Sequence, residues 1–147
     1  MRMTTELVLI DGRWQQSAAS GTFQADNPAT KAPLPAAYPI SSWADVDAAL
    51  DAASRAATQL RTVSGEQIAK FLEHYADGLE RNKDSLVAMA HAETALPMQP
   101  RLADVEFPRT TGQLRSAARA ARTGSWRLPT IDTQLNIRSY HGPLGPV

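Results

Sequence analysis

Apolar residues recur at helical spacing through the middle of the chain. One stretch follows Ser42 and places apolar residues on one face, at Val46, Ala49, Leu50, Ala53, Ala57 and Leu60. A second stretch follows Ser64 and carries the stripe Ile68, Phe71, Leu72, Tyr75 and Leu79. Ser42 with Asp45, and Ser64 with Gln67, have the spacing of a capping box. We therefore predict two amphipathic helices that begin at these serines.

Further helices are predicted after residue 81. The pattern pauses at residues 81–84, where Asn82 or Asp84 can cap a new helix that Pro97 and Pro100 end. A third helical stretch runs from about Arg101 to Arg122. Its predicted inward positions are Leu102, Val105, Leu114, Ala118 and Ala121. Because proline lacks an N–H group, Pro108 should break or kink this helix near Phe107.

Extended structure is predicted at both ends of the chain. Residues 7–10 and 13–15 flank Asp11-Gly12, a pair that favours the tight turn of a β-hairpin. Residues 22–25 suit a short strand closed by the turn at 27–30, and four prolines keep residues 26–40 largely extended. The alternation from Ile131 to Tyr140 predicts one half-exposed strand.

Composition narrows the function classes. The chain has 147 residues, of which 43% are hydrophobic and 20% charged, as is ordinary for a globular domain. Fifteen basic and fifteen acidic residues cancel, so net charge favours neither nucleic acid nor a membrane surface. The chain has no cysteine, which excludes disulfides and a thiol nucleophile within it and indicates a cytoplasmic protein.

Few residues are candidates for chemistry. None of the three histidines, His74, His91 and His141, has a second ligand at helical spacing, so we expect no metal site. The eight glycines form no phosphate-binding loop, and no nucleophile elbow occurs. Four arginines, at 115, 119, 122 and 127, lack interleaved aromatic residues and are interpreted as a solvated face rather than an RNA-binding stripe. Three tryptophans, at 14, 43 and 126, are expected to be packing anchors.

The segment from Arg109 to Arg115 is unusually polar for a helix that packs on a core. One interpretation is a helix that restarts after Pro108, with Thr110 or Thr111 as its cap. The other is one wall of a polar ligand channel. The chain then ends in a glycine- and proline-rich turn at residues 142–147, of the kind that introduces a buried strand, so we expect it to be the front part of a larger protein.

Several of these segments together resemble the N-terminal part of the aldehyde dehydrogenase superfamily. They are residues 10–14, 22–23, 27–30, 44–49, 82–86 with 93–94, and 143–147, in the family's order and spacing. Residues 109–115 and 124–126 are most similar to the branch of 2-oxoglutarate semialdehyde (2,5-dioxopentanoate) dehydrogenases and NADP-dependent fatty aldehyde dehydrogenases. Two positions depart from the pattern. Lys31 replaces a usual glycine, at a cost of about 1 kcal/mol if φ is positive there, and Pro108 interrupts a helix that the branch keeps unbroken.

The resemblance implies an α/β fold in which this segment is mainly helical, with an N-terminal β-hairpin and a C-terminal strand. Residues 1–40 would form the hairpin and an extended arm, and residues 41–122 a helical part that flanks the cofactor domain. Residues 123–147 would supply a strand of the oligomerisation region that leads into the dinucleotide-binding sheet. The partners that the resemblance implies are the remainder of the enzyme chain or other subunits of a homo-oligomer, with neither nucleic acid nor membrane involved.

The resemblance also implies an activity. Such enzymes oxidise an aldehyde, here including 2-oxoglutarate semialdehyde, to a carboxylic acid through a cysteine-bound thiohemiacetal, with NAD or NADP as hydride acceptor. Residues 1–147 contain no cysteine, and the family's general base and cofactor site lie beyond Val147, so this segment is not expected to be catalytic or to bind the cofactor alone. Arg109 and Gln113 are the candidate residues at the mouth of the substrate channel. The alternative is a non-enzymatic helical interaction module or a truncated remnant.

Overall fold

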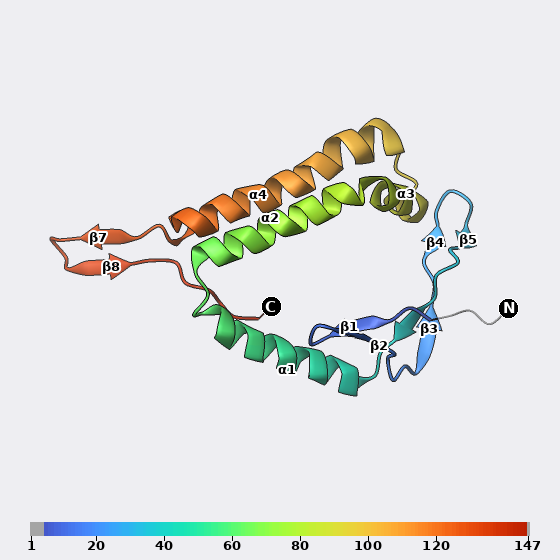
Figure 1. The fold of residues 1–147 in the computed structure, drawn as a ribbon, viewed down its shortest axis with the longest axis horizontal. Coiled ribbons are helices and arrows are strands. Elements are labelled where there is room, and N and C mark those ends of the chain that lie inside the picture. The colour runs from blue at the N-terminus through green and yellow to red at the C-terminus, as the bar shows by residue number, and fades with distance from the viewer. Residues whose placement is uncertain (1–4, 147) are drawn as a thin grey trace.

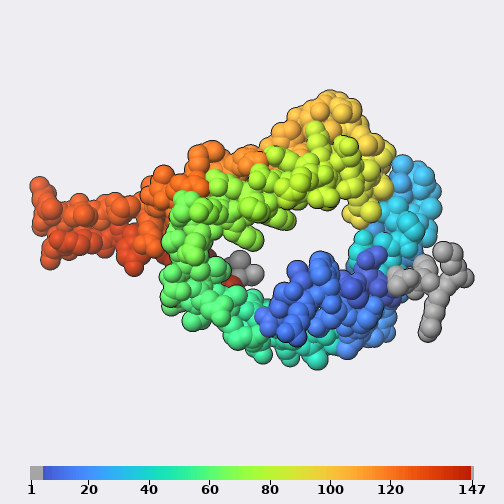
Figure 2. Space-filling model, in the orientation of Figure 1, coloured from blue at the N-terminus to red at the C-terminus, as the bar shows by residue number. Residues whose placement is uncertain are grey.

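The helices and N-terminal strands of the computed structural model, which describes residues 5–146, form an open ring (Figure 1). The space-filling view in Figure 2 shows an opening through the ring, with residues 65–94 on one side and the N-terminal strands together with residues 43–60 on the other. Residues 1–4 of the predicted arm 1–40, and Val147 of the predicted region 123–147, lie outside the described residues.

Short antiparallel strands make up the N-terminal side of the ring. The predicted hairpin is confirmed, since β1 (Val8–Ile10) pairs with β2 (Arg13–Gln15) across a turn in which Asp11 has φ 51° and Gly12 φ 75°. Strand β3 (Gly21–Phe23) pairs with β6 (Tyr38–Ile40). Between them, β4 (Asp26–Asn27) and β5 (Ala32–Pro33) form a second hairpin. Lys31 lies in its turn with φ 55°, in the left-handed region that favours glycine.

The first two helices begin where the sequence predicts. Helix α1 (Trp43–Leu60) is capped by Ser42, whose Oγ accepts a hydrogen bond from the backbone N–H of Asp45 at 3.3 Å. Its capping box is incomplete, because the Asp45 carboxylate instead accepts bonds from Ser17 Oγ at 2.6 Å and the Ala18 N–H at 2.9 Å. Helix α2 (Gly65–Arg81) has the full box between Ser64 and Gln67.

The chain breaks at Asn82 and continues as α3 (Lys83–Thr94). The predicted break is confirmed, but no side chain caps α3, and Asn82 Nδ2 donates back to the Gly78 carbonyl at 2.8 Å. The helix ends at Ala95, which has φ 58°, before the prolines that were expected to end it. A segment of wider helical turns, Met98–Glu106, interrupted at Gln99 by an extended backbone with φ −115° and ψ 136°, then leads into α4 (Phe107–Thr123). The predicted irregularity near Phe107 is thus a change of helical pitch, and Pro108 fits in the first turn of α4.

Helices α2 and α4 run antiparallel and form the most extensive helix–helix contact of the ring. Small residues allow their backbones to approach closely, because Ala69, Ala76 and Ala118 are fully buried between them. The approach is close at Gly65, where an added Cβ would overlap the carbonyl oxygen of Ala121. A second small core joins α3 to the wider turns through Val87, Leu102 and Ala103.

The C-terminal part is a projecting hairpin rather than one continuous strand. Strands β7 (Thr130–Asp132) and β8 (Ile137–Ser139) pair antiparallel and extend away from the ring (Figure 1). Extended structure is therefore confirmed, but the single strand predicted from Ile131 to Tyr140 folds back on itself. The reason is an Asx turn in which Asp132 Oδ1 accepts the N–H groups of Gln134 and Leu135, followed by Asn136 at φ 52°.

Most of the apolar surface of the segment is uncovered. Among residues 5–146 no large side chain is fully buried, and α1 contributes no buried residue. The predicted inward positions Leu50 and Val105 are 58% and 47% exposed, and Trp43 is 82% exposed. The prediction that the tryptophans are packing anchors is therefore wrong for this segment taken by itself. Its apolar stripes exist as predicted, but residues in them such as Leu50 and Phe71 are exposed.

Candidate functional site

The candidate channel residues lie on one exposed face of α4. Arg109 and Gln113 are four residues apart and so point to the same side of the helix, opposite the side that packs on α2. Both are exposed, and Arg109 Nη1 lies 3.6 Å from Glu106 Oε2. The structure therefore brings Arg109 and Gln113 together on a solvent-facing surface whose nearest charged neighbour is Glu106.

Neither threonine after Pro108 caps the helix, so that interpretation of residues 109–115 is wrong. Thr110 Oγ1 donates to the Glu106 carbonyl at 2.9 Å, and Thr111 Oγ1 donates to the Pro108 carbonyl at 3.4 Å. Both are bonds to the preceding turn, because α4 has already begun at Phe107. Thr111 is buried against α2, whereas Arg109 and Gln113 have no such packing role. The polar side chains of residues 109–115 are therefore not explained by capping of α4.

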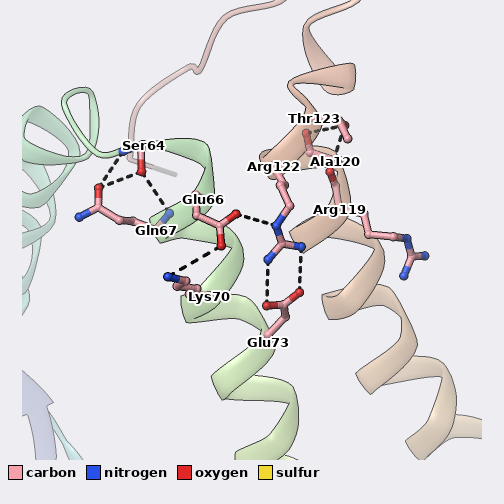
Figure 3. Close-up of polar contacts among 9 residues, drawn as sticks. All are labelled: Ser64, Glu66, Gln67, Lys70, Glu73, Arg119, Ala120, Arg122 and Thr123. Atoms are coloured by element: carbon pink, nitrogen blue, oxygen red, sulfur yellow. Dashed lines mark hydrogen bonds and ion pairs between the residues drawn. The ribbon is translucent and has the colours of Figure 1, made fainter.

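Two other arginines of α4, Arg115 and Arg122, join it to α2, and Figure 3 shows the contacts of Arg122. Arg122 donates from Nε to Glu66 at 2.7 Å, and from Nη1 and Nη2 to the two carboxylate oxygens of Glu73 at 3.0 Å each. These hydrogen bonds from Arg122 hold the pKa of Glu66 and of Glu73 below the ordinary value of 4.5, and the two carboxylates in turn raise the pKa of Arg122.

Arg115 repeats the arrangement further along α2. Its Nη2 donates to Asp77 at 2.8 Å and to Glu80 at 2.9 Å, and these bonds raise its pKa. Arg119 donates to Ser116 on its own helix, and the Arg127 guanidinium lies over the Trp126 ring, 5.3 Å from its centroid. Two of the four arginines are therefore neutralised by α2 carboxylates, which explains their helical spacing without any nucleic acid.

Three glycines of the described residues lie in a turn, at a helix contact and at a helix end, and no cluster of metal ligands is found among the described residues. Within residues 5–146 no three side chains of His, Cys, Asp or Glu gather as metal ligands. Gly12 lies in a hairpin turn, Gly65 packs against the backbone of α4 at Ala121, and Gly124 follows the end of α4 with φ 68°. None of these three glycines stands between a strand and a helix, where a phosphate cradle would need it. No helix in this range is long and apolar enough to cross a membrane.

Comparison with known proteins gives a match along almost the whole chain. The model of the aldehyde dehydrogenase family matches residues 14–147. The chain is 35% identical over 133 residues to alpha-ketoglutaric semialdehyde dehydrogenase 2 of Azospirillum brasilense, covering 90% of this chain and 25% of that protein. It is 30% identical to acetaldehyde dehydrogenase 2 of Cupriavidus necator, covering 94% of this chain and 27% of that protein. The chain thus spans about a quarter of the length of these relatives.

A solved structure has the same arrangement. The aldehyde dehydrogenase of Mycobacterium tuberculosis, crystallised with NAD+, superposes with a TM-score of 0.74 at 23% identity. The superposition covers 88% of this chain and 27% of that structure. The open ring is therefore a fold that recurs inside larger proteins. The uncovered apolar faces of this segment agree with that setting, because a longer chain would bring further residues to cover them.

Proposed function

This chain belongs to the aldehyde dehydrogenase family, a family of oxidoreductases, and corresponds to its N-terminal portion; on that premise we propose that the full-length protein oxidises an aldehyde to a carboxylic acid. The observation that carries the proposal is the family match over residues 14–147. The alternative of a non-enzymatic helical module is not favoured, because the match extends over nearly every element rather than over the helices alone.

NAD or NADP is the proposed hydride acceptor of the full-length protein. The proposed contribution of the residues described here is structural. We propose that residues 41–122 flank the cofactor domain and that residues 1–40 brace them as an arm. The activity is tested by adding aldehyde and either cofactor to the full-length protein and following the ultraviolet absorbance of the reduced cofactor. An aldehyde-dependent rise is expected, and its absence with a panel of aldehydes would refute the proposed activity.

A homo-oligomer located in the cytoplasm is also proposed. The support for assembly is the projecting hairpin within residues 130–140, where Ile131, Ile137 and Tyr140 are 67%, 52% and 70% exposed. A hairpin with exposed apolar side chains gains stability by joining another sheet or subunit. Light scattering after size-exclusion chromatography tests the assembly, and cell fractionation tests the location.

A substrate that carries a carboxylate is proposed for this member of the family. The two named relatives differ in this respect, since alpha-ketoglutaric semialdehyde bears a carboxylate and acetaldehyde does not. Arg109 and Gln113 favour the former, because a guanidinium and an amide can both donate hydrogen bonds to a carboxylate at the mouth of a channel.

The substitution Arg109→Ala in the full-length protein tests this assignment. Loss of a hydrogen bond to a charged group costs about 1.5–3 kcal/mol, and an exposed residue falls at the lower end. KM for 2-oxoglutarate semialdehyde should therefore rise about tenfold, whereas KM for hexanal should change little. Arg119→Ala, on the same helix, is the control and should leave both values unchanged. An equal rise for both aldehydes would rule out recognition of the carboxylate by Arg109.

A further inference from the structure

Three charged residues form a cluster at the start of α4. Glu106, the last residue of the wider helical turns, places one carboxylate oxygen toward each of two arginines. Its Oε1 lies 2.7 Å from Arg101 Nη2, and its Oε2 lies 3.6 Å from Arg109 Nη1. The cluster carries two positive charges and one negative charge, so one positive charge stays unmatched. The two contacts are also unequal, and Arg109 has the longer one.

The arginines of this cluster differ from those that join α2 and α4. Arg115 and Arg122 donate aligned hydrogen bonds of 2.7–3.0 Å to carboxylates. Within residues 5–146, neither Arg101 nor Arg109 makes an aligned side-chain hydrogen bond, so Glu106 is held near them by charge alone. A guanidinium has five N–H donors in a fixed fork. Arg109 therefore keeps donors that a second carboxylate can use, and it is 66% exposed along its side chain.

We propose that Glu106 acts as an internal stand-in for the substrate carboxylate, occupying Arg109 in the free enzyme and ceding it to the substrate while Arg101 retains Glu106. This inference rests on the proposed function, since it assumes an aldehyde with a carboxylate bound at Arg109. The unequal distances set the direction of the exchange, because the weaker contact is released and the closer one is kept. Binding of one further carboxylate makes the cluster electrically neutral. Glu106 is then a positioning residue that sets how strongly the site prefers charged aldehydes.

Two substitutions should move substrate preference in opposite directions. Glu106→Gln keeps the size of the side chain and removes the competing charge, so KM for 2-oxoglutarate semialdehyde should fall about threefold to tenfold. Arg101→Gln removes the partner that retains Glu106. Glu106 should then turn to Arg109, and KM for the same substrate should rise by a similar factor. The informative quantity is the ratio of the KM values for the charged aldehyde and for hexanal, because the cluster acts on the carboxylate and not on the reacting carbonyl.

The experiment measures kcat and KM of the full-length protein for both aldehydes, together with the heat of binding of glutarate, an unreactive dicarboxylate. Asp104→Asn is the matched control, since Asp104 is exposed close by and makes no ion pair within the described residues. Tighter glutarate binding and lower KM in Glu106→Gln, with the reverse in Arg101→Gln, support the inference. Unchanged values in Glu106→Gln, or a change of equal size in Asp104→Asn, overturn it.

The same data separate the inference from the proposal on which it rests. If Arg109→Ala raises KM selectively for the charged aldehyde but Glu106→Gln has no effect, Arg109 binds the carboxylate and Glu106 does not compete for it. If Arg109→Ala is unselective and glutarate gives no heat, the proposed substrate class fails together with the inference. Arg109→Lys adds a further check, because it should restore part of the affinity for the charged aldehyde by keeping the positive charge.

Discussion

Substituting Gly65 by alanine tests whether the close approach of α2 and α4 determines the stability of this segment. A Cβ at this position would overlap the carbonyl oxygen of Ala121 and lie 3.1 Å from its carbonyl carbon. Both atoms belong to backbone, so neither can rotate away, and the start of α2 must shift relative to the end of α4. Overpacking of this kind costs about 1–3 kcal/mol.

The cost has to be separated from the intrinsic preference of alanine for helices, which is worth about 1 kcal/mol relative to glycine. Gly78 provides the matched control because it lies in the same helix. An added Cβ there would meet only Arg81 Nη2, at an ordinary distance of 3.7 Å. We therefore expect Gly78→Ala to be neutral or stabilising. Gly65→Ala should be less stable than Gly78→Ala by about 1–3 kcal/mol.

Urea denaturation of the full-length variants, followed by helical circular dichroism, measures the difference. Each kcal/mol should also lower the melting temperature by about 2–4 °C in a domain of this size. If Gly65→Ala and Gly78→Ala have the same free energy of unfolding, the backbones adjust without cost and the reasoning from close contact is wrong. A loss in both variants would indicate that the contact with α4 is not its cause.

Two further predictions concern single side chains. Lys31→Gly should raise the free energy of unfolding by about 0.5–1 kcal/mol, because lysine at φ 55° is strained and glycine is not. This gain already allows for the conformational entropy that glycine adds to the unfolded chain. Urea denaturation measures the change, and the control Lys70→Gly, within α2, should lower the free energy of unfolding instead. Arg122→Gln should weaken the pH dependence of stability in acid. Arg122 lowers the pKa of Glu66 and Glu73, so the ionised carboxylates stabilise the fold above their ordinary pKa of 4.5. This stabilisation is lost as the pH falls through the lowered pKa values. Denaturation midpoints measured between about pH 5 and pH 3 test the prediction, with Arg119→Gln as a control that should behave as the wild type.

Local signals in the sequence predicted most elements of the fold. Ser64 with Gln67, and Asp11-Gly12, act within four residues, and the structure confirms both the helix start and the turn that they predict. The hairpin at residues 130–139 was missed because the Asx turn at Asp132 interrupts an alternation that continues on either side of it. The incomplete capping box at Asp45 has a similar origin, since its carboxylate bonds to Ser17 and Ala18, far away in the sequence.

The pairing of α2 with α4 could not be predicted from the sequence. The sequence pattern indicated a solvated face of arginines, but the antiparallel contact with α2 gives Arg115 and Arg122 carboxylate partners. The same applies to the candidate site. The polar face with Arg109 and Gln113 was predicted, whereas the approach of Arg101 to Glu106 depends on the wider turns of residues 98–106, which no sequence pattern indicated. Wider turns of this kind are uncommon, and they occur often at functional sites.

The elements on the N-terminal side of the ring are held by small contacts, and this affects which parts of the segment separate first. Helix α1 touches β1, and α3 touches the two-residue strand β4, but neither joint contains a large buried side chain in the described part of the chain. Such joints separate at little cost, while the α2–α4 pair stays intact. Of the contacts that close the ring, the one between α3 and β4 should therefore be the first to exchange its hydrogens for deuterium in the isolated segment, and the α2–α4 pair the last.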